Sequence, residues 1–586
     1  MSSARRGPAG LLTAVLLAGP LLAGCGLPLA DGVQRPGEVA AAERLPEPIN
    51  VLPPGPQPGA SPEGVVLGFL AAQTSARDGH GIARSFLAPD RREAWRADAG
   101  VTVYEPQSLA VGDPRPDGDG VRVDLSVDVV GEVAPDGAAR VQPAQRTVQS
   151  YRLRQGDGEQ WQLVQVPQGL TLSPAGRDRT FEPVSVHFLA PRDAPDASRH
   201  LVADLLRLPA AQDRAATLVD RLLAGPSSAL QGSVQTAVPD GTRLLSPVRT
   251  TPDGEVVVDL SGEVAALSPE RRQELSAQLV WTLRQVPDFT RLRLLALGEV
   301  FPVPGADVVQ KSSAWSGYAP EGPVGRPAGL ALSGGVLRAL DPPLVDEPPP
   351  GPTAQAGVVD HAVDPRLGRV AVLASEDGRR SLLTGPLVGP LDEVLEGSGL
   401  RSPSWGDGER GVWLLRTAPD PGLLLVRTAP ELEPLEIAVE GLPDLGTEPL
   451  LRVSRDGVRV AVVGRGELHV GRFVRDGPRV RVVGLRRLAS SVLDVAWRNG
   501  TTLSVLVEDD DAPLLPLLEV SVDGTSSTPA ALLGVAQGQP VALAASGDQP
   551  LLVETRLDDV STIYSDDGGR GFEVRLRDAR RPAYPR

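Results

Sequence analysis

This chain of 586 residues has little cysteine, lysine or aromatic character. It contains one cysteine, Cys25, and one lysine, Lys311. A single cysteine cannot form an internal disulfide, so packing must stabilise the folded domains. Aromatic residues make up 3% of the chain, which argues against a sugar site built on stacked rings. The formal net charge of −16 argues against a nucleic-acid binder, which would normally present a basic face.

The sequence also lacks a long hydrophobic run near its start. Arg5 and Arg6 precede an apolar stretch, Leu11 to Leu22, of roughly a dozen residues. A helix that crosses about 30 Å of hydrocarbon needs about 20 apolar residues, so this stretch is too short to span. It is typical of a secretory signal instead. Arg5 and Arg6 also suggest twin-arginine export, but the Gly-Pro that follows them fits that signal poorly.

The one cysteine lies directly behind this signal. Leu22-Ala23-Gly24-Cys25 resembles the lipobox of bacterial lipoproteins. The resemblance implies cleavage between Gly24 and Cys25, and attachment of diacylglycerol and palmitate to Cys25. Two or more acyl chains hold a protein stably at a membrane. We therefore expect a lipid anchor on the extracytoplasmic face of the cell membrane; the alternative is a buried structural cysteine.

We expect five segments along the chain. Residues 1–24 form the signal peptide, and residues 25–62 form a tether rich in proline, glycine and alanine. Residues 63–175 combine a helical period with alternating strands such as Val121 to Val129. Helices followed by an antiparallel meander predict an α+β domain, and a cone like that of nuclear transport factor 2 is one candidate fold.

A second α+β domain is expected at residues 180–310. A helix ends at Gly225-Pro226, and Ser268 with Pro269 begins another. The hairpin Leu244 to Leu260 is expected to turn at Thr251 to Gly254. Four motifs resemble the GerMN domain of spore-germination proteins: Leu222 to Pro226, Ala237 to Thr242, Val257 to Ser261 and Gln278 to Leu283. These motifs describe a fold more than a chemistry.

The pattern of residues 325–586 predicts short apolar strands separated by turns that contain Gly and Asp. A loose repeat with a period of roughly 40 to 50 residues predicts a β-propeller, with the number of blades left open. The tryptophans Trp405, Trp413 and Trp497 fall at repeat positions that favour packing. Ser565 to Phe572 is close to the Asp-box, a structural hairpin turn of some propellers.

The sequence offers few catalytic or metal-binding candidates. The five histidines, at 80, 187, 200, 361 and 469, lack the spacing of a metal pair, and His187 reads as a half-buried neutral side chain in a strand. Carboxylates near strand ends, Asp360 with Asp364 or Glu508 to Asp511, are candidates for a glycosidase pair. Solvated turns explain them better. The acidic runs Asp113 to Gly120 and Glu508 to Asp511 lack the spacing of a Ca²⁺ loop. We therefore expect no catalytic residue, cofactor or metal.

The order of signal, lipobox, tether, α+β domain, GerMN-like domain and propeller resembles the LpqB-type lipoproteins of high-GC Gram-positive bacteria. That resemblance implies a non-enzymatic envelope protein that binds the extracytoplasmic domain of an MtrB-type sensor histidine kinase and modulates its signalling. A propeller that binds or hydrolyses wall glycans is the alternative function. A purely structural bridge between membrane and wall is a third interpretation.

Overall fold

The computed structural model describes residues 52–586 with internal gaps. The gaps are 157–158, 192–199, 211–212, 321–328, 341–356, 365–367, 388, 407–410, 418–419, 428–433, 477–478, 509–516, 531–537, 548, 567–570 and 586. Gly24, Cys25, the signal peptide and most of the expected tether lie outside the described residues. In the part of the chain that is described, no helix combines the length and the apolar character that a membrane crossing requires.

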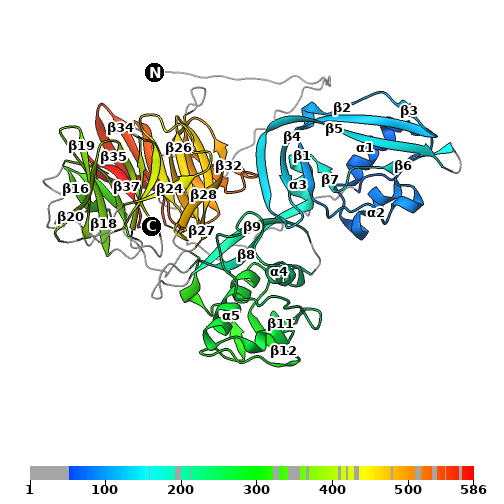
Figure 1. Ribbon diagram of the computed structural model, residues 1–586, viewed down its shortest axis with the longest axis horizontal. Helices are drawn as coiled ribbons and strands as arrows, with labels where there is room; N and C mark the ends of the chain where they lie inside the picture. Colours follow the sequence, from blue (N-terminus) through cyan, green and yellow to red (C-terminus); the bar gives the residue numbers. More distant parts are fainter. Residues whose placement is uncertain are drawn as a thin grey trace, which may run out of the picture. The chain divides into compact units, whose positions relative to one another are not determined.

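The first domain packs helices against a long sheet that is antiparallel except for the parallel pair β1 and β7 (Figure 1). Helix α1 (Pro62–Ala72) begins where the Ser61 hydroxyl accepts a hydrogen bond from Gly64 N, with proline at the first helical position. The sheet has the order β6-β5-β4-β1-β7, and β2 and β3 add to β4. Its members are β1 (Val101–Tyr104), β2 (Ala110–Val111), β3 (Arg115–Asp117), β4 (Gly120–Val133), β5 (Ala139–Gln155), β6 (Trp161–Gln165) and β7 (Leu170–Leu172).

Strict alternation of apolar and polar residues explains β4. Val123, Leu125 and Val127 point into the core and are fully buried, as the sequence predicts. The second helix, α2 (Arg77–Ser85), begins with residues in left-handed conformation, and this feature was not predicted. The helices and sheet match the expected α+β class; the likeness to nuclear transport factor 2 stays a prediction.

A two-stranded ribbon and an α/β layer form the second domain. The ribbon pairs β8 (Phe181–Leu189) with β9 (Leu201–Pro209), and helices α4 (Arg214–Leu223) and α5 (Pro269–Leu283) contact β8. Strands β11 (Glu255–Leu260) and β12 (Arg291–Ala296) run parallel, joined through α5. The sheet is completed by β10 (Arg249–Thr250), β13 (Glu299–Val300) and β14 (Val309–Lys311).

The expected helix starts and stops of this domain are observed. Ser268 caps α5, and Leu275, Leu279 and Leu283 on its inner face are fully buried. The predicted hairpin is shorter than expected. Its first arm is reduced to β10 and an isolated bridge at Leu244, because Pro247 has no N–H to donate to a strand ladder.

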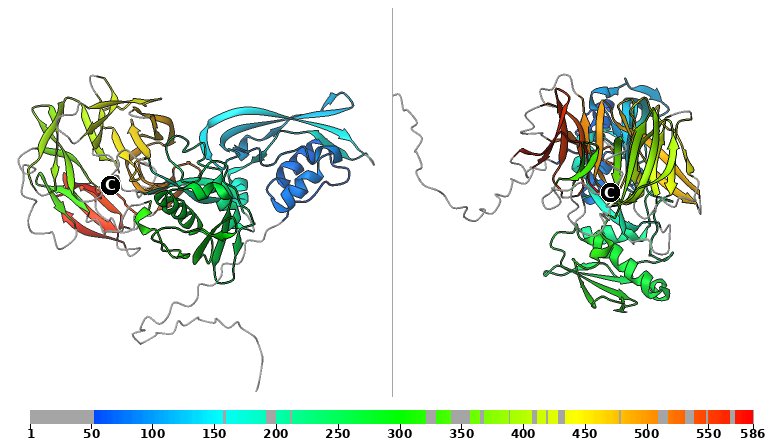
Figure 2. Two further views of the ribbon diagram at one scale, coloured as in Figure 1. Left: turned by 60° about the horizontal axis from the view of Figure 1, so that its bottom comes forward. Right: turned by 90° about the vertical axis from the view of Figure 1, so that its left-hand side faces the viewer.

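The third domain is a propeller whose sheets surround one axis (Figure 2). Five four-stranded groups follow one another along the chain: β17–β20, β21–β24, β25–β28, β29–β32 and β33–β36. Their innermost strands are β17 (Val358–Val363), β21 (Leu400–Trp405), β25 (Leu450–Val453), β29 (Val492–Asn499) and β33 (Gln539–Ala544). A sixth group joins β15 (Leu330–Ser333) and β16 (Val336–Ala339) to β37 (Arg580–Ala583).

The remaining strands lie further from the axis within these groups. They are β18 (Arg369–Glu376), β19 (Arg379–Pro386), β20 (Asp392–Gly397), β22 (Gly411–Arg416), β23 (Gly422–Arg427), β24 (Leu435–Val439), β26 (Arg459–Gly464), β27 (Glu467–Asp476), β28 (Arg479–Ala489), β30 (Thr502–Val507), β31 (Leu517–Ser521), β32 (Ser527–Ala530), β34 (Leu552–Leu557), β35 (Val560–Asp566) and β36 (Phe572–Arg577). The described residues thus supply six blades, a number that the sequence repeat did not fix. The centre of the expected Asp-box, residues 567–570, lies outside the described residues.

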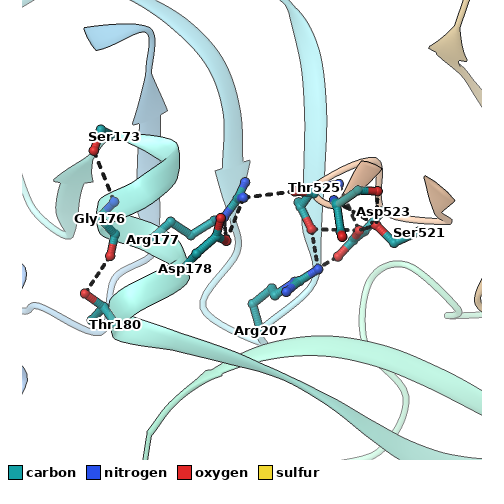
Figure 3. A network of polar contacts seen from close by, with 10 residues as sticks. Ser173, Gly176, Arg177, Asp178, Thr180, Arg207, Ser521, Asp523 and Thr525 are labelled. Carbon is teal, nitrogen blue, oxygen red and sulfur yellow. Dashed lines mark hydrogen bonds and ion pairs between the residues drawn. The ribbon is translucent and has the colours of Figure 1, made fainter. Parts of the chain in front are cut away.

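Buried charges join the second domain to the propeller. Arg207 on β9 pairs with Asp523, in the turn between β31 and β32, at 3.1 Å, and both side chains are more than nine-tenths buried (Figure 3). Arg207 also donates to Thr525 Oγ1, and Arg177 on α3 (Pro174–Thr180) donates to the Thr525 carbonyl at 3.0 Å. Burial alone would raise the pKa of Asp523, but Arg207 and the hydrogen bonds from Ser521 and Thr525 lower it.

The same ribbon contacts the neighbouring blade and the first domain. Arg459 on β26 donates to Ala203 O at 2.5 Å while pairing with Asp456 at 2.9 Å. On the other side, Arg207 N donates to Gly137 O at 2.8 Å, in the turn between β4 and β5. Residues Leu52–Arg586 form one compact unit by their internal contacts, and this ribbon touches all three domains.

Gly254 provides a test of the close backbone contact with Asp288 in the second domain. Its φ is +77°, and an added Cβ would overlap the carbonyl oxygen of Asp288. Gly241 has a similar φ of +81°, but nothing lies within 4 Å of the added Cβ. We expect Gly241→Ala to lower the free energy of unfolding by about 1 kcal/mol and Gly254→Ala by at least about 3 kcal/mol. Denaturant unfolding measures both, and equal losses would contradict the close contact.

The Arg207–Asp523 pair gives a second prediction. Arg207→Met leaves a buried carboxylate without its cation, and we expect a loss of about 3 to 5 kcal/mol. The matched control is Arg214→Met, since Arg214 pairs with Glu182 at 2.7 Å but at the surface, where a loss of up to about 1 kcal/mol is expected. Denaturant unfolding again measures the loss. Adding Asp523→Leu to Arg207→Met should restore part of the stability; no restoration would show that the charge is not the cause.

Candidate functional site at the propeller axis

Charged side chains from four blades surround a small cavity at the propeller axis. Its volume is about 50 Å³, and Asp360, Arg452, Asp494 and Arg581 line it from β17, β25, β29 and β37, together with His361. The innermost strands contact one another around the axis. A cavity of this size accommodates water or a small ion rather than a sugar.

Asp494 joins three blades by hydrogen bonds to residues of the two neighbouring blades. It is 3% exposed, and its Oδ1 accepts from Arg452 Nη2 at 3.1 Å and from Val495 N at 2.8 Å. Its Oδ2 accepts from Leu543 N at 2.9 Å, on the next blade. A carboxylate that accepts three such hydrogen bonds is held in place, which suits a structural role in joining the blades.

Neighbouring blades use other side chains for the same purpose. The Ser402 hydroxyl accepts from Leu451 N at 2.8 Å, and the indole of Trp405 donates to Ala362 O at 3.0 Å. The indole of Trp497 donates to Arg452 O at 2.8 Å. Trp405 and Trp497 are buried, as is Trp413, so the predicted packing role of these tryptophans is confirmed.

The two predicted carboxylate candidates near β17 are not brought together at this cavity. Asp360 lines the cavity, where its Oδ1 accepts from His361 N at 2.9 Å and its charge is the main cause of a raised pKa at Arg581. Asp364 follows the end of β17 and is not among the lining residues. Glycoside hydrolysis needs two carboxyl groups facing one bond, and this pair does not provide them. Of Glu508 to Asp511, only Glu508 lies in a described position, where it is exposed.

His187 and His361 are buried, and burial lowers the pKa of both rings. Burial lowers the pKa of His361 to about 4, and neither ring nitrogen has a hydrogen-bond partner among the described residues. Burial, assisted by Arg284, lowers the pKa of His187 to about 3. His187 is 8% exposed, so it is more buried than the sequence suggested. Within the described ranges, no group of three or more His, Cys, Asp or Glu side chains is placed to hold a metal ion.

The acidic run between β3 and β4 is engaged by arginines. Asp119 pairs with Arg152 at 3.0 Å and with Arg154 at 3.8 Å, and Asp117 lies 3.8 Å from Arg152. These pairs are partly exposed, so each contributes little to stability. They explain the carboxylates of this turn without a bound cation.

Arg452, Asp494 and Arg581 were not predicted from the sequence. One signal was available: Ser402 and Asp494 each stand three residues before a repeat tryptophan, Trp405 or Trp497. A polar residue at the same place in two repeat strands indicates a shared role in joining blades. No comparable spacing identifies Arg452, whose strand ends in Val453.

The aromatic side chains leave no platform for a sugar. The chain has seven tryptophans, five tyrosines and eight phenylalanines, all of them within described positions. Each is buried or partly buried, and none is exposed. Sugar sites generally stack rings against accessible Trp or Tyr, so this surface disfavours the glycan alternative.

Models of known protein families match the three domains of this chain. A model described as the lipoprotein LpqB β-propeller domain matches residues 340–585. A model of the lipoprotein LpqB N-terminal domain matches residues 55–176, so these two models together cover more than half of the chain. Between them, residues 185–300 match a model described as sporulation and spore germination.

Full-length relatives carry the same name. Lipoprotein LpqB of Thermobifida fusca is 28% identical, with 96% of this chain and 97% of the relative covered. The LpqB of Cutibacterium acnes is 28% identical over 87% and 88% of the two chains, and that of Streptomyces coelicolor is 28% identical over 93% of each. The predicted resemblance and its multidomain fold class, an α+β domain, a GerMN-like domain and a β-propeller, are confirmed. The chain belongs to the LpqB lipoprotein family.

Proposed function

We propose that this lipoprotein is a non-enzymatic accessory of a two-component system. It is anchored at Cys25 on the extracytoplasmic face of the membrane, and it binds the extracytoplasmic domain of an MtrB-type sensor histidine kinase and modulates its signalling. The relatives are named as lipoproteins rather than as enzymes. An extracytoplasmic lipoprotein with a β-propeller is the architecture on which this role builds.

The observation that carries the proposal is the engagement of the polar groups at the axis. Asp494 and Ser402 are occupied in joining blades, and the cavity at the axis, which Asp494 lines, holds about 50 Å³. Asp360 and Asp494 both line this cavity, but its volume leaves no room for a sugar between them. The chain is therefore better suited to present surfaces to a protein than to catalyse a reaction.

An exposed aliphatic patch on the second domain is our candidate kinase-binding surface. Leu297, Val300 and Val308 are 63%, 46% and 55% exposed and lie along β13 and the approach to β14, on one edge of the sheet. Leu297 also adopts a positive φ of 54°, which holds its side chain on the hairpin turn. Exposed apolar groups on a sheet edge favour contact with another protein.

Binding to the kinase is the direct test. We expect the chain from Leu52 to Arg586 to bind the purified ectodomain of the cognate sensor kinase saturably, as measured by calorimetry. Substituting Val300→Ser and Val308→Ser should weaken binding at least about tenfold, because interface cores depend on buried apolar side chains. The matched control, Leu557→Ser with Val560→Ser, removes side chains that are 49% and 50% exposed on a propeller hairpin and should leave the affinity unchanged.

Isolated muropeptides serve as the parallel ligand. Saturable binding of muropeptides without binding of the ectodomain would replace this proposal with the wall-glycan alternative. Equal weakening by both double variants would remove the sheet edge as the binding surface while leaving kinase binding in place.

The anchor is tested separately. We expect Cys25→Ser to abolish the attachment of labelled palmitate in cells. The diacylglycerol is attached to the sulfur of the cysteine, and serine has no sulfur. Gly24→Ala keeps a small residue before the cysteine and should retain the label. Mass spectrometry of the mature N-terminus checks both outcomes, and a lipidated Cys25→Ser protein would contradict the assignment.

A further inference from the structure

The largest of the cavities described lies away from the propeller axis. Its volume is about 380 Å³, within the range of small-molecule sites, and it is lined by α2, the Trp95–Gly100 segment, the ends of β1 and β4, and the C-terminal end of β9. Most of its wall is apolar and includes Val101, Leu170 and Leu208. Nothing in the proposed kinase binding uses this space.

Two buried polar atoms at this cavity have no partner among the described residues. They are Nδ1 of His80 and Nε1 of Trp95. His80 is 8% exposed and Trp95 is 2% exposed, and their ring centroids lie 6.2 Å apart. Leaving a buried donor or acceptor unpaired costs free energy, so two such atoms on neighbouring rings of one cavity call for an explanation.

The backbone holds His80 at this place in an uncommon conformation. Asp78, Gly79 and His80 have φ values of 51°, 60° and 63°, a run of three left-handed residues. Such conformations are sparsely populated outside glycine and cluster at ligand sites. Arg84 stabilises the arrangement, since its guanidinium donates to Gly79 O at 2.8 Å and to Trp95 O at 3.0 Å.

The two unpaired atoms have complementary character. Burial lowers the pKa of His80, so its ring is neutral near pH 7. The ring also hydrogen-bonds to backbone groups of Gln73 and Ser75. Since Nδ1 has no partner, these bonds belong to the other nitrogen, which leaves Nδ1 as an acceptor. The indole Nε1 of Trp95 can only donate. A hydroxyl group satisfies both atoms, because its oxygen accepts from the indole while its hydrogen is donated to the imidazole.

The geometry points to a ligand site in this cavity for a small, largely apolar molecule that carries a hydroxyl group. The apolar wall takes the body of the molecule, and His80 Nδ1 and Trp95 Nε1 bind the hydroxyl. The site lies where the first domain meets the ribbon, because Phe181, Arg207 and Leu208 line it together with residues of the first domain. Occupancy therefore stabilises that contact.

Three probes that differ only at one group test the site. They are 4-phenylphenol, its methyl ether, which accepts but cannot donate, and biphenyl, which does neither. Binding to the chain from Leu52 to Arg586 is followed by ligand-observed NMR. We expect 4-phenylphenol to bind saturably, at least about tenfold more tightly than biphenyl, with the ether between them; tenfold is the ratio that one net hydrogen bond provides.

Variants assign the binding to the cavity. Trp95→Phe removes the N–H and should reduce the preference for 4-phenylphenol over biphenyl about tenfold. Trp161→Phe, on β6 and absent from the lining, is the matched control and should leave the preference unchanged. Ala97→Trp fills the cavity and should abolish binding of all three probes while circular dichroism reports an intact fold. This variant keeps the test decisive if Trp95→Phe unfolds.

Two results would overturn the proposal. Absence of saturable binding by 4-phenylphenol would mean that the cavity holds only water. Equal affinity for the three probes, or a preference that survives Trp95→Phe, would mean that the hydroxyl is not bound by these two side chains. Neither result bears on binding of the kinase, so the two proposals fail independently.

Discussion

Closure of the propeller ring is the constraint on which the rest of the structure depends. The last strand, β37, pairs with β15, which lies near the start of the propeller, so that the green and red ends of the domain meet (Figure 1). Without β37, the sixth blade would lack its innermost strand and β15 would be left as an open strand edge. The closed ring brings Asp360, Arg452, Asp494 and Arg581 to one axis and supports the turn that carries Asp523.

Buried charge takes the place of covalent bonding between the domains. The one cysteine lies ahead of the folded part, so no disulfide can tie the domains together. The junction uses Arg207 with Asp523 and Arg459 with Asp456, pairs whose side chains are almost fully buried. Such pairs repay their desolvation only where further hydrogen bonds satisfy them, and Thr525 and Ala203 O provide these bonds. The contacts are therefore specific as well as stabilising.

Local patterns predicted the elements well and the sites poorly. The alternation in β4 and the cap of α5 at Ser268 act within a few residues, so both were predictable. The arm before β11 is shorter than its apolar pattern predicts, because Pro247 cannot donate a hydrogen bond to the strand ladder. The left-handed run at His80 has no sequence signature, since Asp and His occupy ordinary helices as well. Its function at the cavity depends on Trp95, which lies in a different segment.

The sequence by itself determined three features: the lipobox prediction at Cys25, the order of the domains and the repeat of the propeller. Each of these depends on neighbouring residues or on a regular period along the chain. Only the tertiary structure decided the number of blades, the network at the axis, the junction and the cavity. Arg207 and Asp523 are separated by 316 positions, and no local preference selects one for the other. Such pairs arise when packing buries two charges that must then satisfy each other.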